Sequence, residues 1–361
     1  MRIALIVPPF ISVPPKGYGG TELFAAHLAR GLANLGLDVV VYTNGESTVA
    51  VEKKWLYPTS LWPINSDIHT DLRDINHGGW AVEDAAKTCD IIHISNAPSL
   101  VHSRFVDLPF VYTIHHPRDK GLSNFYSYYP DAWYVSISDF QRKLEALPKI
   151  RTIHHGVDPS CYTLGTGKRE HLVFLGRIAP VKGTHTAIEV AKRTGIPLKI
   201  AGEIQPMFKG YFESKVKPHI DGKLIEYVGE ADLKMKNELL GSSLGLLFPI
   251  EWDEPFGLVM IEAMACGAPV FAFPGGSVAE VVRDGVSGYV CQSLDDMVKR
   301  AKQANEFDAA KVQAYGLGEF SLDRMVQAYA DLYAEILGER TAAQATESLE
   351  VGELDEPRAI A

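Results

Sequence analysis

A strand, a loop and a helix follow one another in the segment LGLLFPIEWDEPFGLVMIEAMACG (residues 244–267). The apolar run that ends at Pro249 has the length of a strand, the next residues are acidic, and a helix is predicted over residues 258–266. A continuous apolar strand that leads into a helix is typical of a parallel sheet covered by helices. The segment therefore predicts one β-α unit of an α/β domain.

The same alternation extends over most of the chain. In the first half, strands are predicted at residues 3–7, 39–42, 90–94, 110–114, 133–136 and 150–154, with helices at 21–35 and 139–147. After a turn at Gly156 the pattern starts again, with strands at 172–175, 198–201, 224–228, 244–249, 269–272 and 288–291. Two doubly wound units explain this pattern, and ligands of such units bind beyond the carboxyl ends of the strands. We therefore predict an α/β protein with two Rossmann-like domains that face a central cleft.

The predicted boundaries place the first domain at residues 1–158 and the second at residues 159–320. Apolar residues at 322, 325, 326, 329, 332, 333 and 336 then follow a helical period, so residues 321–338 are predicted to form a helix that packs back on the first domain. Residues 339–361 are acidic and have no apolar period, which predicts a disordered tail.

Composition excludes several classes of protein. The formal charge of −10 over 361 residues argues against nucleic acid as a partner. The four cysteines are far apart in the sequence, so neither a disulfide framework nor a cysteine zinc site is expected. No apolar run reaches the roughly 20 residues of a transmembrane helix, and the first apolar run is too short for a signal peptide. We expect a cytoplasmic location, with peripheral attachment to the inner membrane left open.

Two carboxylates, Glu254 and Glu262, bracket the predicted start of the helix. Free backbone amides at a helix start can donate to an anion or to sugar hydroxyls, and a carboxylate can accept from both hydroxyls of a diol. An isolated pair of glutamates at this spacing usually lies on the surface. Here the second one lies in so apolar a helix that its burial requires a partner, which favours a binding role.

This segment resembles the Glu-x7-Glu element of the retaining GT-B glycosyltransferases of family 4, through Glu254-Pro255-Phe256-Gly257 and Glu262-Ala263-Met264-Ala265-Cys266-Gly267. The resemblance implies a GT-B fold with an N-terminal acceptor domain and a C-terminal nucleotide-sugar domain. It also implies that Glu254 contacts hydroxyls of the transferred sugar and that Glu262 contacts the ribose. The backbone amides of Phe256, Gly257 and Leu258 are then expected to reach the sugar or the phosphate.

A second element, Gly176-Arg177-Ile178-Ala179-Pro180-Val181-Lys182-Gly183, directly follows a predicted strand. Two cations five residues apart on such a loop can neutralise a diphosphate leaving group, although a solvated basic loop has the same composition. Family 4 enzymes carry a similar Gly-Arg and Lys-Gly pair, and the resemblance assigns Arg177 and Lys182 to the donor diphosphate.

Two N-terminal elements complete the predicted site. Gly19 and Gly20 open a helix after the first strand, where consecutive amides can bind phosphate, although a plain turn is the alternative. The resemblance places this loop near the donor phosphates and the acceptor. It also places a histidine after the strand at residues 110–114 close to the transferred sugar, and we assign that place to His115 rather than His116. His154 and His155, at the domain junction, are predicted to be structural.

Further residues are predicted with less specific roles. Gly275 and Gly276 precede a helix whose counterpart occurs in the same family, and these glycines could line the cleft. Residues 46–79 match no motif but contain Trp55, Tyr57, Trp62 and Asp67, and residues 124–129 are also aromatic. Aromatic rings stack on sugars but more often fill cores, so acceptor contact and packing both stay open for these stretches.

The predicted function is transfer of a hexose, with retention, from a UDP- or GDP-linked sugar to a hydroxyl acceptor. The acceptor could be a saccharide, a lipid-linked sugar or a small metabolite. No metal or other cofactor is expected, because Arg177 and Lys182 supply the positive charge that a metal would otherwise provide. The alternatives are a sugar-nucleotide epimerase of the same fold and a carbohydrate- or nucleotide-binding protein without turnover.

Overall fold

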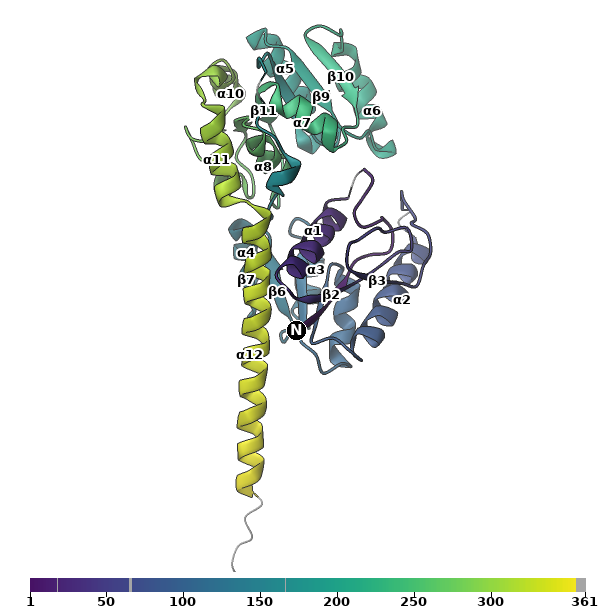
Figure 1. Ribbon diagram of the computed structural model, residues 1–361. Helices are drawn as coiled ribbons and strands as arrows, with labels where there is room; N and C mark the ends of the chain where they lie inside the picture. Colours follow the sequence, from purple (N-terminus) through teal and green to yellow (C-terminus); the bar gives the residue numbers. More distant parts are fainter. Residues whose placement is uncertain (18, 65–66, 166, 355–361) are drawn as a thin grey trace, which may run out of the picture.

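The computed structural model describes residues 1–17, 19–64, 67–165 and 167–354. These residues form two α/β domains, one above the other in Figure 1, with a long C-terminal helix beside the lower domain. Each domain is built on one parallel sheet with helices on both faces. The predicted fold class of two doubly wound units is therefore confirmed.

The N-terminal sheet has the strand order β3-β2-β1-β4-β5-β6-β7. Its strands are β1 (Arg2–Ile6), β2 (Asp38–Thr43), β3 (Glu52–Trp55), β4 (Ile91–Ile94), β5 (Phe110–Ile114), β6 (Trp133–Ser136) and β7 (Ile150–Thr152), and its helices are α1 (Gly20–Asn34), α2 (Ile68–Ala85), α3 (Lys120–Tyr126) and α4 (Asp139–Leu144). The strand order reverses between β1 and β4, which is where ligands of doubly wound sheets bind.

The edge strand β3 and the helix α2 fall in the stretch that matched no motif. β3 has the sequence EKKW and is half-buried to exposed, because it pairs only with β2 at the edge of the sheet. Polar residues are typical of edge strands, and a strand rich in them lacks the apolar pattern from which strands are predicted. Asp67, one of the four residues singled out in this stretch, caps α2 by accepting a hydrogen bond from Thr70 N at 2.9 Å.

The C-terminal sheet has the order β10-β9-β8-β11-β12-β13 and reverses between β8 and β11. Its strands are β8 (His171–Leu175), β9 (Leu198–Ala201), β10 (Ile225–Gly229), β11 (Ser243–Phe248), β12 (Val270–Ala272) and β13 (Gly288–Val290), and its main helices are α5 (Thr184–Thr194), α7 (Leu233–Gly241), α8 (Leu258–Ala265), α9 (Val278–Val281), α10 (Leu294–Ala301) and α11 (Ala309–Glu319). The loops after β8 and β11 carry the predicted cationic and Glu-x7-Glu elements. They therefore meet at the second switch point.

The chain crosses between the domains twice, and the two crossings lie side by side. Val157 N donates to Phe320 O at 2.9 Å, and Leu322 N donates to Val157 O at 2.8 Å. After the second crossing, the first part of α12 (Leu322–Leu354) runs along the N-terminal domain, and the helix then projects beyond it (Figure 1). Its buried residues Met325, Val326 and Tyr329 join the core that also contains α1 and the N-terminal sheet.

The structure corrects the prediction of a disordered tail from residue 339. α12 continues to Leu354, and residues 355–361 lie outside the described part of the chain. Residues 339–354 are rich in alanine and glutamate, which have high intrinsic helix propensity. A missing apolar period therefore does not exclude a helix in this segment.

Candidate functional site

A cavity of about 450 Å³ lies between the two domains at the carboxyl ends of both sheets. The predicted site residues that line it are Gly20, His115, Arg177, Lys182, Glu254, Phe256, Gly257 and Leu258. They come from loops after β1, β5, β8 and β11 and from the starts of α1 and α8. The two switch points thus bring together side chains that are more than 200 residues apart in the sequence.

The central contact of this cavity joins Lys182 to Glu254. Lys182 Nζ lies 2.5 Å from Glu254 Oε2, and both side chains are largely buried. Trp252 Nε1 donates to the same Oε2 at 2.9 Å, and Lys182 Nζ lies 4.4 Å from the centre of the Trp252 ring. Burial lowers the pKa of Lys182, and the carboxylate of Glu254 partly offsets this effect. Lys182 and Glu254 therefore form a buried ion pair at the wall of the cavity, in which each charge neutralises the other.

Two glycines with a positive φ shape the loops after β8 and β11. Gly183 has a φ of 72°, and a Cβ there would lie 1.8 Å from Pro249 O. Gly257, the N-cap of α8, has a φ of 79°. Both positions therefore require glycine, and the close approach at Gly183 sets the short distance between Lys182 and Glu254.

Arg177 lies on the C-terminal wall of the cavity, on the loop after β8. Its Nη1 donates to Gln205 Oε1 at 3.4 Å, and Gln205 Nε2 in turn donates to Glu203 Oε2 at 3.2 Å. These contacts hold the guanidinium beside the loop after β9. Arg177 and Lys182 therefore line the same cavity, and their contact with a donor diphosphate stays a prediction.

Glu262 is buried one turn into α8, beside the main cavity rather than in its lining. It lines a small adjoining cavity of about 10 Å³ together with Leu258. Its Oε1 accepts from Tyr162 Oη at 2.8 Å and from Lys236 Nζ at 2.9 Å. These two contacts supply the partners that burial of a glutamate in an apolar helix requires, and both use the same oxygen.

On the opposite wall, α1 begins at Gly20, and Gly19 is its N-cap. A Cβ on Gly20 would meet only Leu258 Cδ1, at 3.9 Å, so the starts of α1 and α8 face each other across the cleft. Gly19 has a φ of 149° and does not line the cavity, although it adjoins Gly20. The starts of α1 and α8 therefore lie at the same cleft, and binding of phosphate by the amides of Gly19 and Gly20 stays a prediction.

Both residues of the His115-His116 pair line the cavity, but their surroundings differ. His116 Nε2 lies 2.6 Å from Tyr126 Oη. The ring of His115 stacks on His155 with centroids 5.6 Å apart, and its buried Nε2 has no hydrogen-bond partner within the described residues. Burial and then the neighbouring His155 hold the pKa of His115 well below 6.5. His115 is therefore a neutral imidazole at the cavity wall whose buried Nε2 has no hydrogen-bond partner within the described residues.

Two family models match the chain. The model for glycosyl transferases group 1 covers residues 164–307, and the model for glycosyltransferase family 4 covers residues 18–160. Their boundary falls at the first crossing between the domains, and together they take in most of the chain. The chain belongs to glycosyltransferase family 4. It is a glycosyltransferase.

Relatives of this family 4 enzyme align over most of their length. A glycogen synthase of Mycobacterium tuberculosis is 27% identical over 82% of this chain and 83% of its own. Spore coat protein SA of Bacillus subtilis is 23% identical over 89% of this chain and 93% of its own. Phosphatidyl-myo-inositol mannosyltransferase of Mycobacterium leprae is 26% identical, with 82% and 84% covered.

Solved structures confirm the fold. The sucrose-phosphate synthase of Thermosynechococcus elongatus superposes with a TM-score of 0.77 at 18% identity, covering 94% of this chain and 100% of its own. Anabaena Alr3699/HepE in complex with UDP and glucose gives 0.74 at 17% identity, covering 93% and 100%. The predicted GT-B architecture is therefore confirmed for this family 4 enzyme.

The structure places several other residues differently from their predicted roles. Gly275 and Gly276 do not line the cavity. A Cβ on Gly276 would lie 2.1 Å from Glu254 O, so this glycine supports the Glu254 loop from behind. His155, predicted to be structural, lines the cavity. Trp252, to which the sequence analysis assigns no role, also lines the cavity and lies under Lys182 Nζ.

The structure places the two aromatic stretches, residues 46–79 and 124–129, in different surroundings. Tyr126 is fully buried and Tyr129 nearly so, and both pack in the core of the N-terminal domain. Trp62 lines a second cavity of about 680 Å³ between the domains, together with Gln205 and Met207. Acceptor contact therefore stays a prediction for the first stretch, and core packing explains much of the second.

Two further properties of the family 4 enzyme follow from the described residues. Among them, no helix is long and apolar enough to cross a membrane. The three potential metal ligands that lie close together in this part of the chain are Asp139, His154 and Glu280, and none of them lines the cavity.

The buried histidines of this enzyme predict acid sensitivity. Burial lowers the pKa of His93 and of His155 to about 3. The unfolded chain binds a proton at each of these residues below about pH 6.5, whereas the folded chain does not until about pH 3, so stability is full above pH 6.5 and is lost as the pH falls through this window. Each histidine should lower the free energy of unfolding by about 1.4 kcal/mol at about pH 5.5.

Glu22 acts in the opposite direction, because burial raises its pKa to about 7 and its uptake of a proton stabilises the fold as the pH falls.

The variant His93→Gln isolates the contribution of one histidine to this pH dependence. Unfolding in urea at about pH 7.5 and about pH 5.5 should show a pH-dependent loss that is about 1.4 kcal/mol smaller in the variant. An equal loss in both proteins would contradict the assignment of His93 as a buried neutral group.

Proposed function

We propose that this enzyme transfers a hexose from a UDP- or GDP-linked sugar to a hydroxyl acceptor, with retention of anomeric configuration and without a metal. The observation that carries the proposal is the contact between Lys182 and Glu254 at the wall of a cavity that also contains Arg177. Two cations beside a sugar-binding carboxylate are the groups that a diphosphate sugar requires. The complex of the structural neighbour Alr3699/HepE with UDP and glucose also supports a nucleotide-sugar donor.

The geometry suggests how donor binding changes the site. Without a ligand, Lys182 and Glu254 neutralise each other. A diphosphate placed between Arg177 and Lys182 attracts the ammonium group, and Glu254 is then free to accept hydrogen bonds from hydroxyls of the sugar. The amides at the starts of α1 and α8 donate to the phosphate or sugar oxygens, and the second oxygen of Glu262 accepts from the ribose.

The transfer step follows from these contacts. The bond between the anomeric carbon and the phosphate oxygen breaks, and Arg177 and Lys182 stabilise the charge that develops on the diphosphate. The anomeric carbon becomes oxocarbenium-like, and the acceptor hydroxyl attacks from the same face. Its proton passes to the departing phosphate oxygen, so no protein carboxylate forms a covalent bond to the sugar. His115, a neutral imidazole, donates or accepts a hydrogen bond at a sugar hydroxyl.

A panel of UDP- and GDP-linked hexoses tests the proposal by thermal shift and by release of the nucleotide diphosphate. A donor at about 100 times its dissociation constant should add about 2.7 kcal/mol of stability. We expect at least one donor both to stabilise the protein and to be hydrolysed or transferred, with the same rate in the presence of EDTA. Binding of donors with no turnover would favour a binding protein, and conversion of a donor into an epimeric product without an acceptor would favour an epimerase.

A further inference from the structure

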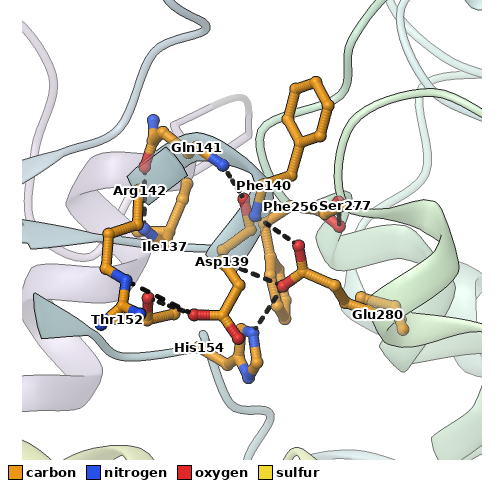
Figure 2. Close-up of polar contacts among 12 residues, drawn as sticks. Ile137, Asp139, Phe140, Gln141, Arg142, Thr152, His154, Phe256, Ser277 and Glu280 are labelled. Carbon is orange, nitrogen blue, oxygen red and sulfur yellow. Dashed lines mark hydrogen bonds and ion pairs between the residues drawn. The ribbon is translucent and has the colours of Figure 1, made fainter. Parts of the chain in front are cut away.

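One carboxylate joins the two domains beside the cavity (Figure 2). Glu280 of α9 accepts from Asp139 N through Oε2 at 2.7 Å and from Phe140 N through Oε1 at 2.5 Å. Its Oε2 also lies 3.0 Å from His154 Nε2. Glu280 belongs to the C-terminal domain and its three partners belong to the N-terminal domain. Hydrogen bonds to an ionised carboxylate are roughly twice as strong as those between neutral groups.

On the C-terminal side, this carboxylate is connected to the loop that carries Glu254. Ser277 precedes α9, and its N–H donates to Glu254 O at 2.9 Å. The Ser277 hydroxyl donates to Phe256 O at 2.8 Å. Because Gly276 also contacts the backbone of Glu254, the start of α9 and the Glu254 loop form one packed unit. A shift of α9 would therefore move the catalytic loop.

On the N-terminal side, the same carboxylate is connected to the turn that carries His115. Asp139 and Phe140 open α4, and the next residue is Gln141, which is buried. Gln141 Nε2 donates to Ile114 O at 3.1 Å and to His116 O at 2.8 Å. The start of α4 therefore holds the backbone on both sides of His115.

We propose that Glu280 is a positioning residue, which fastens the N-terminal wall of the cavity to the C-terminal wall. It does not line the cavity, so it acts on the reaction only through α4 and the Glu254 loop. The proposal rests on the proposed function, because it gives Glu280 the task of setting Glu254 and His115 against the same donor sugar. Small displacements of such groups have large effects on rate.

The hydrogen bonds also explain the three potential metal ligands at this place. Both oxygens of Glu280 accept backbone N–H groups, and Asp139 Oδ1 accepts from Thr152 Oγ1 at 2.6 Å. The cluster is therefore a set of satisfied polar groups that links the domains.

Glu280→Gln tests the role while it preserves the shape of the side chain. The amide oxygen of the glutamine can still accept one backbone N–H group. Its NH₂ group, however, faces the other N–H donor, so one hydrogen bond between the domains is lost. We expect kcat for donor turnover to fall about 10-fold to 100-fold, the effect of losing a charge-assisted hydrogen bond and its alignment. Affinity for UDP or GDP, measured by calorimetry, should stay close to that of the wild type, because Arg177, Lys182 and Glu262 all belong to the C-terminal domain.

Small-angle X-ray scattering of the nucleotide complex gives a readout that needs no acceptor. We expect a larger radius of gyration for Glu280→Gln than for the wild type. Glu335→Gln is the matched control, since Glu335 Oε1 also contacts another element, at 2.7 Å from Arg151 Nη2, but lies exposed and away from the cavity. This control should leave turnover and radius unchanged.

Wild-type turnover in Glu280→Gln would overturn the proposal, and so would an unchanged radius of gyration or a loss of nucleotide affinity equal to the loss of rate. Failure of the proposed function is a different result. In that case the wild type itself shows no turnover of any nucleotide sugar, while the scattering comparison still tests whether Glu280 joins the domains.

Discussion

Replacing Lys182 by alanine should lower kcat for donor turnover about 100-fold to 1000-fold, which is the effect of removing one donor to a developing negative charge. The reason is that Lys182 is buried at the cavity wall, where its charge is weakly screened by water. Arg177→Ala should have an effect of the same order. Initial rates of UDP or GDP release at saturating donor measure both variants.

Lys192→Ala is the matched control for this prediction. Lys192 belongs to α5 in the same domain and is exposed, and its Nζ lies 3.1 Å from His219 Nδ1. Its removal should leave kcat unchanged. If Lys182→Ala and Arg177→Ala turned over the donor at a rate similar to that of Lys192→Ala, these cations would not assist departure of the diphosphate.

Gly276→Ala should lower both the stability and the activity of the enzyme. A Cβ at this position would lie 2.1 Å from Glu254 O and 2.5 Å from Glu254 N, and the φ of 59° is itself unfavourable for alanine. The loop must therefore move, which displaces Glu254 from Lys182. We expect a loss of stability from both backbone strain and overpacking, together with a loss of turnover.

Gly285→Ala separates the two contributions. Gly285 has a similar φ of 70°, but a Cβ there would have nothing within 4 Å. It should cost about 1–2 kcal/mol through backbone strain alone, and Gly276→Ala should cost about 1–3 kcal/mol more through overpacking. Urea unfolding of the two variants measures the difference. Equal stabilities would mean that the contact behind the Glu254 loop is not tight.

Much of the fold could be predicted because the central strands are buried on both faces. β1, β5, β8 and β11 are apolar over most of their length, and their spacing by helices indicates parallel sheets. β3 could not be predicted, because an edge strand needs no apolar face and therefore shows no apolar pattern. The extension of α12 beyond residue 338 was not predicted, because the prediction used the apolar period, whereas helix propensity favours the helix there.

The candidate site was partly predictable for a related reason. Their place after predicted strands puts Arg177, Lys182 and Glu254 at one edge of a parallel sheet, and the resemblance to family 4 supplied their expected roles. Trp252 and His155 were missed, because their roles depend on contacts with Lys182 and His115 across the fold. The role of Glu280 could not be predicted, since nothing near it in the sequence indicates that its partners lie more than 100 residues away.

The central claim is that Arg177 and Lys182 bind the diphosphate of a nucleotide sugar in the cavity between the domains. A crystal structure with UDP, or with GDP if only GDP raises the melting temperature, tests it most directly. We predict phosphate oxygens within hydrogen-bonding distance of Lys182 Nζ and of the Arg177 guanidinium, with Lys182 drawn away from Glu254. A nucleotide bound elsewhere, with the contact between Lys182 and Glu254 unchanged, would contradict the claim.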